Sequence, residues 1–350
     1  MPLWIKEKLF QKFLIGKNLK KIDKNFDTKK IMFSEHHFSH AASAFFPSPF
    51  DEAIILNLDG VGEWATSTLA IGKKNKIRII SEINFPHSLG LLYSAFTYYL
   101  GFKVNSGEYK IMGLAPYGKP IYEELIFDKI VDLKNDGSFR LNQKYFNYCY
   151  GLTMTNSRFD NLFKKKRRKP ETENLTDFHM NIAASIQTVT EKIILNITDH
   201  LSRKYNISNL CLSGGVALNC VANGKILKQK KFKNLWIQPA AGDTGGSLGA
   251  AFAYWYDIKN NKRIANKNDS MKGSFLGPSY SNQKVETELS KLKAKYNYMN
   301  ESDLIDTVAE LIKNGKAIGW FQGRMEFGPR ALGCRSILAD PRSEKMQKIL

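Results

Sequence analysis

The feature that most restricts the fold is an alternation of apolar and amphipathic segments between residues 177 and 258. An amphipathic stretch with helical periodicity at 177–205 precedes an apolar run at 209–215. A second apolar run, at 234–242, is followed by a small-residue stretch of helical character at 244–258. Strands that alternate with helices indicate a parallel or mixed sheet covered by helices. We therefore predict an α/β fold.

A different pattern precedes these units. Residues 53–60, AIILNLDG, form an apolar run that ends in Asp-Gly, which is typical of a buried strand that stops at a turn. The segments ATSTLAIG and IRIISEI predict two further strands, and residues 88–102 predict a helix. Ligands of such sheets bind at the carboxyl ends of strands, where Asp59, the turn at 213–215 and Asp243 all fall. We expect these strand ends to face one crevice.

Composition excludes some classes of protein. With 350 residues and 43% hydrophobic content, the chain can form a large core. It has no run near the roughly 20 apolar residues that span a bilayer, and its four cysteines are scattered, so we expect a cytoplasmic protein with reduced thiols. The net charge of +19 is compatible with anionic partners. Its densest run, KKKRRK at 164–169, is predicted to be a solvated loop, with a binding patch as the alternative.

Three of the six histidines lie within five positions. His36 and His40 are four apart and His37 and His40 three apart, so either pair would share one helix face. With Asp59 and Asp243 they would form a mixed nitrogen and oxygen donor set suited to Fe(II), Zn(II) or Mn(II). The alternative is a helix start whose histidines face solvent.

Two glycine-rich segments follow predicted strands, SGGVALN at 213–219 and AGDTGGSLGAA at 241–251. In such turns the backbone can approach a phosphate, and the N-terminus of the next helix favours negative charge. The first is not a P-loop, because no lysine follows its second glycine in register. One turn of this kind is more often a tight connection, whereas two in consecutive units suit a bound nucleotide.

Two further segments carry charged residues among glycines and prolines. SGEYKIMGLAPYG, at 106–118, lacks clear periodicity and is predicted to be a loop whose Glu108 and Lys110 contact substrate or form a structural ion pair. GRMEFGPRALGCRS, at 323–336, contains three arginines that could bind phosphate or carboxylate bidentately. We predict an anion site at Arg324, Arg330 and Arg335, with interdomain salt bridges as the alternative.

Six segments, in order over most of residues 31–345, resemble the NodU/CmcH family of O-carbamoyltransferases: EHHFSHAASAFFPSPF, LDGVGEWATS, SGEYKIMGLAPYG, LSGGVALNCVANG, AAGDTGGSLGAA and GWFQGRMEFGPRALGCRSILADPR. The resemblance implies an actin-like ATPase domain of ribonuclease H-like fold, joined to a YrdC-like domain. On this basis we divide the chain into a helical lead-in (1–30), an actin-like domain (31–260), a linker (261–300) and the start of a YrdC-like domain (301–350).

The resemblance also implies a reaction and a set of site residues. The YrdC-like domain would make carbamoyl-adenylate from carbamoyl phosphate and ATP, and the actin-like domain would transfer the carbamoyl group to a hydroxyl of a sugar or natural product. The implied metal, usually iron, would be held by His36, His40, Asp59 and Asp243, with His37 outside the ligand set. The implied nucleotide contacts are Ser213, Gly214, Gly215, Asn219, Gly242, Thr244 and Gly245, and the predicted catalytic residues are Glu108, Lys110 and Asp59.

The chain also departs from the family pattern. Family members begin with a strand carrying a His-Asp-Ser motif, which we do not find before residue 31, and the YrdC-like match stops after Arg342. We therefore expect a chain truncated at both ends, with an incomplete active site. The expected partners are carbamoyl phosphate, ATP with magnesium and a hydroxylated acceptor, with a homodimer as a further possibility and nucleic acid disfavoured. The alternatives are tRNA threonylcarbamoyl transfer and a degenerate nucleotide- or metal-binding module.

Overall fold

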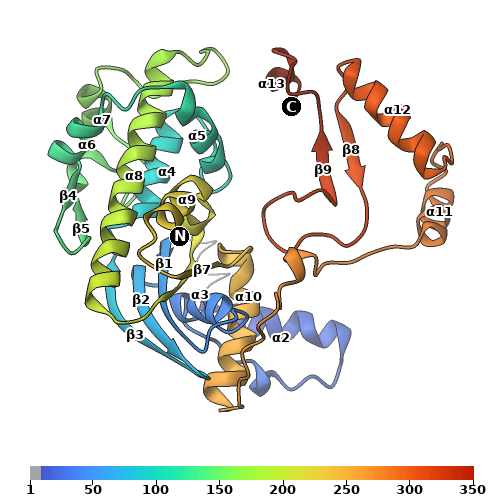
Figure 1. Ribbon diagram of the computed structural model, residues 1–350, viewed down its shortest axis with the longest axis horizontal. Helices are drawn as coiled ribbons and strands as arrows, with labels where there is room; N and C mark the ends of the chain where they lie inside the picture. The colour runs from blue at the N-terminus through green and yellow to red at the C-terminus, as the bar shows by residue number, and fades with distance from the viewer. Residues whose placement is uncertain (1–8) are drawn as a thin grey trace.

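The computed structural model describes residues 9–350, so residues 1–8 of the predicted helical lead-in lie outside it. Its centre is a five-stranded sheet in the order β3-β2-β1-β6-β7 (Figure 1). The first three strands form an antiparallel meander, and the last two extend it in parallel with β1. This mixed sheet confirms the predicted α/β fold class. The strands are β1 (Glu52–Gly62), β2 (Ala65–Lys73), β3 (Lys76–Asn84), β6 (Asn209–Ser213) and β7 (Asn234–Ile237).

Helices cover both faces of this sheet, which explains the nearly continuous apolar sequence of β1. Alternate residues of β1 enter different hydrophobic clusters: Ile54, Leu56 and Leu58 lie in one, and Ala53 and Ile55 in the other. The two faces are covered by α4 (Leu89–Tyr99) and α8 (Asp177–Lys204) on one side, and by α3 (His36–Phe45) and α10 (Asp243–Phe252) on the other.

Residues 106–118, predicted as a loop, are mostly helical. They form α5 (Glu108–Leu114) followed by the 3₁₀ turn η3 (Ala115–Tyr117). The helix forms because Ile111 and Leu114, three residues apart, are both buried in the core. The loop prediction was wrong because Gly113 weakens the local helical signal, while tertiary packing decides the structure.

Shorter elements complete the main body. They are α2 (Gln11–Ile22), η2 (Thr28–Lys30), α6 (Glu123–Lys129), β4 (Val131–Leu133), β5 (Phe139–Leu141), η4 (Gln143–Tyr145), α7 (Ser157–Leu162), η5 (Gly215–Leu218), α9 (Cys220–Gln229) and the π-helix η6 (Ala253–Ile258).

Buried Arg263 fixes the C-terminal end of α3 to the chain that follows the sheet. Its guanidinium lies 4.5 Å from the ring of Phe45 and has only backbone carbonyls as hydrogen-bond acceptors. A cation at a helix C-terminus is favourable because the last carbonyls there lack helical partners. The accepting carbonyls are those of Phe45, Phe46, Ser48, Phe50 and Lys74, at 2.8–3.3 Å.

The C-terminal elements lie beside the main body (Figure 1). They are η7 (Lys272–Ser274), α11 (Asn282–Lys291), α12 (Glu301–Lys313), the antiparallel pair β8 (Ile318–Phe321) and β9 (Arg335–Leu338), and α13 (Met346–Ile349). The sequence did not predict α11, whose residues are all at least partly exposed. The loop between β8 and β9 returns to the main body, where Arg330 donates to the carbonyl of Leu218 at 2.6 Å.

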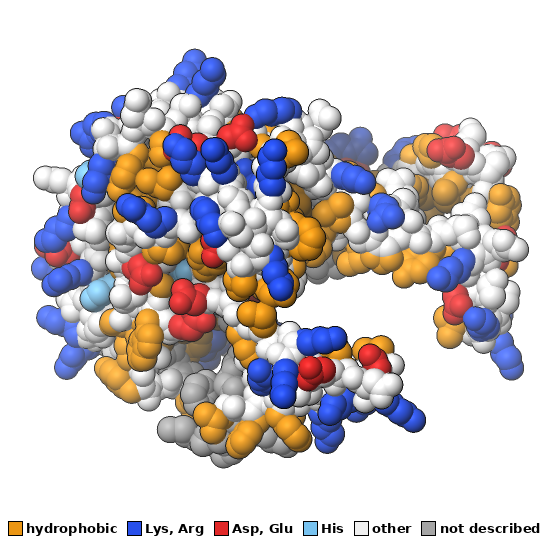
Figure 2. Space-filling model, turned by 90° about the horizontal axis from the view of Figure 1, so that it is seen from below, with side chains coloured by type: hydrophobic (Ala, Val, Ile, Leu, Met, Phe, Trp, Pro, Cys, Tyr) orange, Lys and Arg blue, Asp and Glu red, His pale blue; other side chains and the backbone are white. Residues whose placement is uncertain are grey.

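The basic charge is spread out. Figure 2 shows lysine and arginine side chains scattered over the visible face, without a single basic patch. Within residues 9–350, no helix has the length and apolar character needed to cross a membrane.

Candidate metal centre

Two histidines of α3 and two aspartates from separate elements converge on one point. His36 and His40 lie one turn apart, Asp59 lies near the end of β1, and Asp243 is the first residue of α10. One possible ligand atom from each lies within 4.8 Å of the others. The structure thus brings together the four residues that the family resemblance implies as ligands.

The separations of these atoms fit a shared cation. Nε2 of His36 lies 3.0 Å from Asp59 Oδ2, 3.1 Å from His40 Nε2 and 3.5 Å from Asp243 Oδ1. Nε2 of His40 lies 3.3 Å from Asp59 Oδ2 and 3.7 Å from Asp243 Oδ1. Ligands held at about 2.0–2.2 Å from one ion are themselves roughly 3.0–3.5 Å apart at right or tetrahedral angles. The donor set is the mixed one that iron, zinc and manganese accept.

The electrostatics of the cluster also call for positive charge. Burial opposes ionisation of Asp59, but hydrogen bonds to His36 and His40 hold its pKa well below the usual range. The bond to His40 likewise lowers the pKa of Asp243. Burial would lower the pKa of His40, yet its bonds to Asp243 and Asp59 raise it to about 9. A proton on His40 therefore offsets part of the negative charge of the two carboxylates, and a bound cation could replace it.

Polar side chains in the core hold α3 on the sheet. Asn57 of β1 donates to the carbonyl of His37 at 3.1 Å and to Thr68 Oγ1 at 2.7 Å. Ser213 donates to the carbonyl of His40 at 2.9 Å and to Oδ1 of Asn57. Asn57 and Thr68 were not predicted from the sequence, where the only signal was a single asparagine within the apolar run AIILNLDG. Ser213, predicted to contact nucleotide, is fully buried with its hydroxyl engaged here.

His37 lies outside the cluster. Its Nδ1 is 3.2 Å from Thr68 Oγ1, and burial lowers its pKa to about 4. His37 is therefore neutral at pH 7.

The second ring nitrogen of His40 lacks a hydrogen-bond partner. Its Nδ1 is buried with no partner among the described residues, whereas the second nitrogen of a metal-binding histidine usually donates a hydrogen bond.

The first glycine turn touches the cluster directly. Gly214 has φ +84°, and a Cβ there would lie 2.2 Å from the carbonyl oxygen of Leu58. Gly215 donates its N–H to Asp59 Oδ1 at 2.8 Å. Asn219 caps α9 and exchanges hydrogen bonds of 3.0 and 3.1 Å with Gln187, so both ends of its amide have protein partners.

The second glycine turn begins α10. Gly242 is its N-cap residue, Thr244 is exposed, and Gly245 is buried. A Cβ on Gly245 would lie 2.1 Å from the carbonyl oxygen of Ala240, so the turn requires glycine there. Because Asp243 lies in this turn, both glycine turns border the metal cluster.

The three loop arginines donate to backbone carbonyls. Arg330 contacts Leu218 at the end of η5, Arg324 donates to Gly277 at 2.9 Å, and Arg335 stacks 3.4 Å over the Phe321 ring. Within the described part of the chain, none of the three forms a salt bridge, which was the alternative prediction. Only Arg330 is placed beside a predicted nucleotide-binding turn.

Glu326, which the sequence alone did not single out, shapes this arginine loop. Its Oε1 accepts the backbone N–H of Leu332 and of Cys334, both at 2.8 Å. These bonds, that of Cys334 first, lower its pKa to about 2. An acidic residue among arginines and glycines was its only sequence signal.

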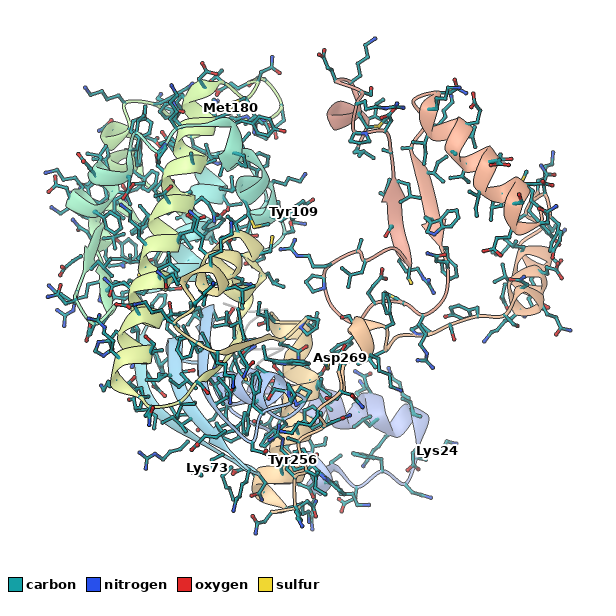
Figure 3. The ribbon with its side chains drawn as sticks, in the orientation of Figure 1. Lys24, Lys73, Tyr109, Met180, Tyr256 and Asp269 are labelled. Atoms are coloured by element: carbon teal, nitrogen blue, oxygen red, sulfur yellow. The ribbon has the colours of Figure 1, made fainter. Side chains whose placement is uncertain are left out.

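Glu108 and Lys110 lie near the start of α5. Glu108 accepts hydrogen bonds from Ser94 Oγ at 2.8 Å and from the Asn105 N–H at 2.9 Å. Lys110 is exposed, with its Nζ 6.0 Å from the Tyr109 ring. Tyr109 lies on the side of the main body that faces the C-terminal elements (Figure 3). The catalytic roles of Glu108 and Lys110 stay predictions.

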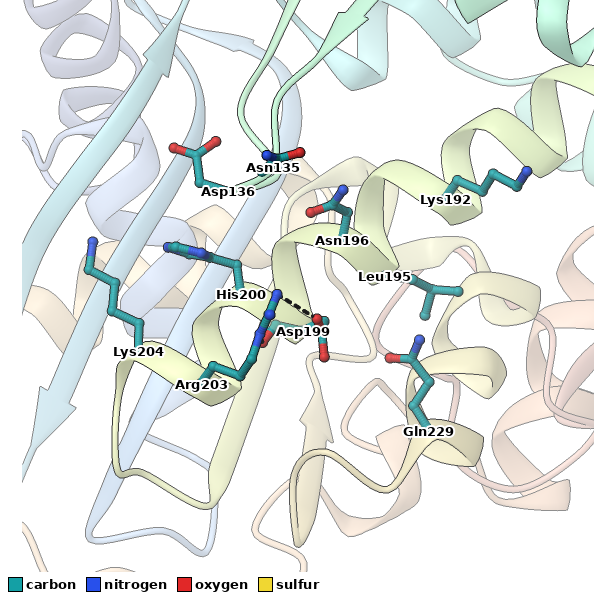
Figure 4. Close-up of a pocket in the computed structure, with 10 residues that line it drawn as sticks. All are labelled: Asn135, Asp136, Lys192, Leu195, Asn196, Asp199, His200, Arg203, Lys204 and Gln229. Atoms are coloured by element: carbon teal, nitrogen blue, oxygen red, sulfur yellow. Dashed lines mark hydrogen bonds and ion pairs between the residues drawn. The ribbon is translucent and has the colours of Figure 1, made fainter.

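A surface pocket of about 900 Å³ lies elsewhere, along the C-terminal half of α8 (Figure 4). Asp199 in this pocket forms ion pairs with Arg203 at 2.7 Å and Lys231 at 3.1 Å. No residue of the metal cluster or of the glycine turns lines it. The pocket therefore does not belong to the candidate centre.

With this geometry in place, two family profiles match the sequence. The carbamoyltransferase N-terminus profile matches residues 1–252, and the carbamoyltransferase C-terminus profile matches residues 309–350. The chain therefore belongs to the carbamoyltransferase family.

Individual relatives agree with this assignment. An uncharacterized protein of Synechocystis sp., sll1178, is 56% identical over all of this chain and 57% of its own length. Nodulation protein NolNO of Sinorhizobium fredii is 38% identical over 90% of this chain and 44% of its own length. Nodulation protein NolO of Bradyrhizobium diazoefficiens is 35% identical over 88% of this chain and 53% of its own length. The chain thus spans about half the length of these relatives.

Among solved structures, HypF of T. kodakarensis aligns with a TM-score of 0.38 and 15% identity. The alignment covers 70% of this chain and 39% of HypF. A similarity this weak carries no functional argument.

Proposed function

We propose that the chain holds the transfer site of an ATP-dependent O-carbamoyltransferase that acts on a hydroxyl of a sugar or natural product. The observation that carries the proposal is the cluster of His36, His40, Asp59 and Asp243, bordered by two glycine turns. Family membership supports the class of reaction. The four cluster residues support a bound cation, and the glycine turns beside them support a neighbouring site for an anionic donor.

The metal would be iron(II), with zinc and manganese as alternatives, held by these four side chains. Two ionised carboxylates and two neutral imidazoles would carry two negative charges, which a divalent cation balances. When bound, the metal supplies a Lewis acid that polarises a phosphoryl or carbonyl oxygen. Asp59 stays ionised over the physiological range because its pKa is held low.

The donor would be carbamoyl-adenylate, made with magnesium from carbamoyl phosphate, water and ATP, with release of phosphate and pyrophosphate. Backbone N–H groups at the start of α10, around Thr244 and Gly245, suit its phosphate. The acceptor oxygen would form a bond to the carbamoyl carbon while the bond to the adenylate oxygen breaks. AMP leaves, and the hydroxyl proton passes to a base. Glu108 and Lys110 remain the proposed catalytic residues on α5.

The test begins with the metal. The purified chain is loaded anaerobically with Fe(II), Zn(II) or Mn(II), and bound metal is counted by elemental analysis. We expect one equivalent per chain, and none in the His40→Ala variant. A metal content that His40→Ala leaves unchanged would reject the centre.

The reaction is tested on the metal-loaded chain with ATP and radiolabelled carbamoyl phosphate. A panel of mono- and oligosaccharides serves as acceptor, and synthetic carbamoyl-adenylate replaces the two donors in a parallel assay. Label transferred to sugar from carbamoyl-adenylate supports a transfer site. No transfer from either donor would reject activity of this chain, while metal binding is scored separately.

A further inference from the structure

Helices α3 and α10 are in close backbone contact at Gly249. A Cβ on Gly249 would lie 1.8 Å from the carbonyl oxygen of Ser39, 2.7 Å from its carbonyl carbon and 3.1 Å from Ser43 Cβ. Ser39 and Ser43 both lie on α3, and Gly249 is buried. The two helix backbones are therefore in direct contact, which leaves no room for any side chain.

The two helices in this contact carry three of the four metal-cluster residues. α3 supplies His36 and His40, and α10 begins at Asp243, six residues before Gly249. A helix of this length moves as a rigid rod, and six residues span only about 9 Å along its axis. The separation of the helices at Gly249 therefore sets how far Asp243 lies from the histidines.

We propose that Gly249 is a positioning residue for the metal centre. By allowing α10 to lie against the backbone of α3, it lets Asp243 reach the cation held by His36 and His40. This inference rests on the proposed metal site and extends it to a residue that touches no ligand atom.

The magnitudes support a specific effect of Gly249. Carbon and oxygen atoms that do not bond to each other normally stay more than about 3.2 Å apart, so a methyl group would push the helices apart by roughly 1.5 Å. Metal–ligand distances tolerate only about ±0.2 Å. A displacement of this size would exceed what the bonds from Asp243 can absorb without rearrangement of its side chain.

The same helix contains a matched control. Gly246 also lies on α10, yet a Cβ there would meet nothing within 4 Å. Gly246→Ala therefore changes helix propensity in the same way as Gly249→Ala, without touching α3. Any difference between the two variants reports the contact with α3.

The experiment titrates Co(II), a coloured divalent probe, into the whole chain and the variants G249A, G246A, D243N and G249A/D243N. We expect G249A to weaken cobalt binding at least tenfold and to give an absorption spectrum like that of D243N. G246A should bind within about twofold of the unaltered chain. In the D243N background, G249A should weaken binding by no more than about twofold further, because the ligand through which it acts is gone.

Several outcomes would overturn the inference. Cobalt binding by G249A as tight as that of the unaltered chain would reject it, and so would an equal loss caused by G249A with and without Asp243. Absence of cobalt binding by the unaltered chain would reject the metal centre itself, which is a different result. Far-ultraviolet circular dichroism establishes that each variant is folded.

A gentler variant covers the case in which G249A does not fold. Ser43→Thr adds one methyl group to the same contact from α3 and keeps the hydroxyl that donates to the His40 carbonyl. Ser43→Ala is its control. We expect S43T to weaken cobalt binding severalfold more than S43A in the presence of Asp243, and equal binding by the two variants would reject the proposal.

Discussion

Gly215 and Asp59 are joined by a hydrogen bond of 2.8 Å from the backbone N–H to the carboxylate, while the other oxygen of Asp59 lies 3.0 Å from His36. One carboxylate thus connects a glycine turn to the histidine pair. The glycine turn at Gly215 and the metal cluster are therefore coupled, because a displacement of either one would move the Asp59 side chain.

Loss of His36 or Asp59 should severely weaken metal binding. We expect His36→Ala and Asp59→Asn to weaken cobalt binding by more than about 100-fold, since even changes in residues that only support a ligand cost 10- to 100-fold. His200→Ala, on the far part of α8, is the control and should bind like the unaltered chain. Isothermal titration calorimetry measures the affinities. Equal affinity in all variants would contradict the ligand set.

Asn57 should be important for stability. Asn57→Leu removes donors to the His37 carbonyl and Thr68 and one of the two acceptors of the Ser213 hydroxyl, so we expect a loss of about 2–4 kcal/mol in the free energy of unfolding. Thr68→Val removes one part of the same network, and its effect should not add to that of Asn57→Leu. Urea denaturation of the single and double variants measures this. Full additivity would show that the network is not shared.

Arg263 should stabilise the end of α3 more than any surface ion pair does. Arg263→Met leaves buried carbonyls without donors, and we expect a loss of about 2–4 kcal/mol in the free energy of unfolding. The control is Lys267→Ala, which removes an exposed ion pair with Asp51 and should change stability by less than about 1 kcal/mol. Similar losses in both variants would contradict the role of Arg263.

His179 should make the fold sensitive to mild acid. Burial, with help from Lys165 and Arg168, lowers the pKa of His179 from 6.5 to about 4. Between these values the unfolded chain takes up a proton that the folded chain does not, so stability falls as the pH drops from about 6.5 to 4. Above about pH 6.5 this histidine is neutral in both the folded and the unfolded chain, so it contributes no pH dependence to the stability.

The variant that isolates this effect is His179→Gln. Nδ1 of His179 accepts the Thr176 N–H at 3.0 Å in a capping box at the start of α8, and glutamine can take the same place. We expect the difference in melting temperature between the two proteins to change steadily from pH 7 to pH 4.5, with other titrating groups cancelling. A difference independent of pH would show that His179 is not the group responsible.

The sequence predicted the sheet because its strands are encoded locally. The apolar runs of β1, β6 and β7 predicted the fold class. Strand β1 continues through Asp59 and Gly60 to Gly62, so the turn predicted at Asp-Gly was wrong. The helix α5 was missed because its burial depends on residues far away in the chain. Helical spacing left His36/His40 and His37/His40 open as pairs, and the family resemblance selected the first.

Other parts of the site could not be read from the chain alone. The partners of Asn57 and the carbonyls that receive Arg263 and Arg330 are set by tertiary contacts between distant segments. The requirement for glycine at position 249 likewise arises only when α10 meets α3. Patterns of residue type indicate which elements form, whereas these contacts depend on how closely the elements approach.

The four residues of η5 have two attachments at opposite ends. The Gly215 amide holds Asp59 at one end, and the Leu218 carbonyl receives Arg330 from the C-terminal segment at the other. A donor molecule that bound Arg330 would therefore break its hydrogen bond to the Leu218 carbonyl at one end of η5. The other end of η5 holds Asp59 of the metal cluster through the Gly215 N–H. Because coupling between binding events is reciprocal, a cation at Asp59 would alter the affinity for that donor by the same factor.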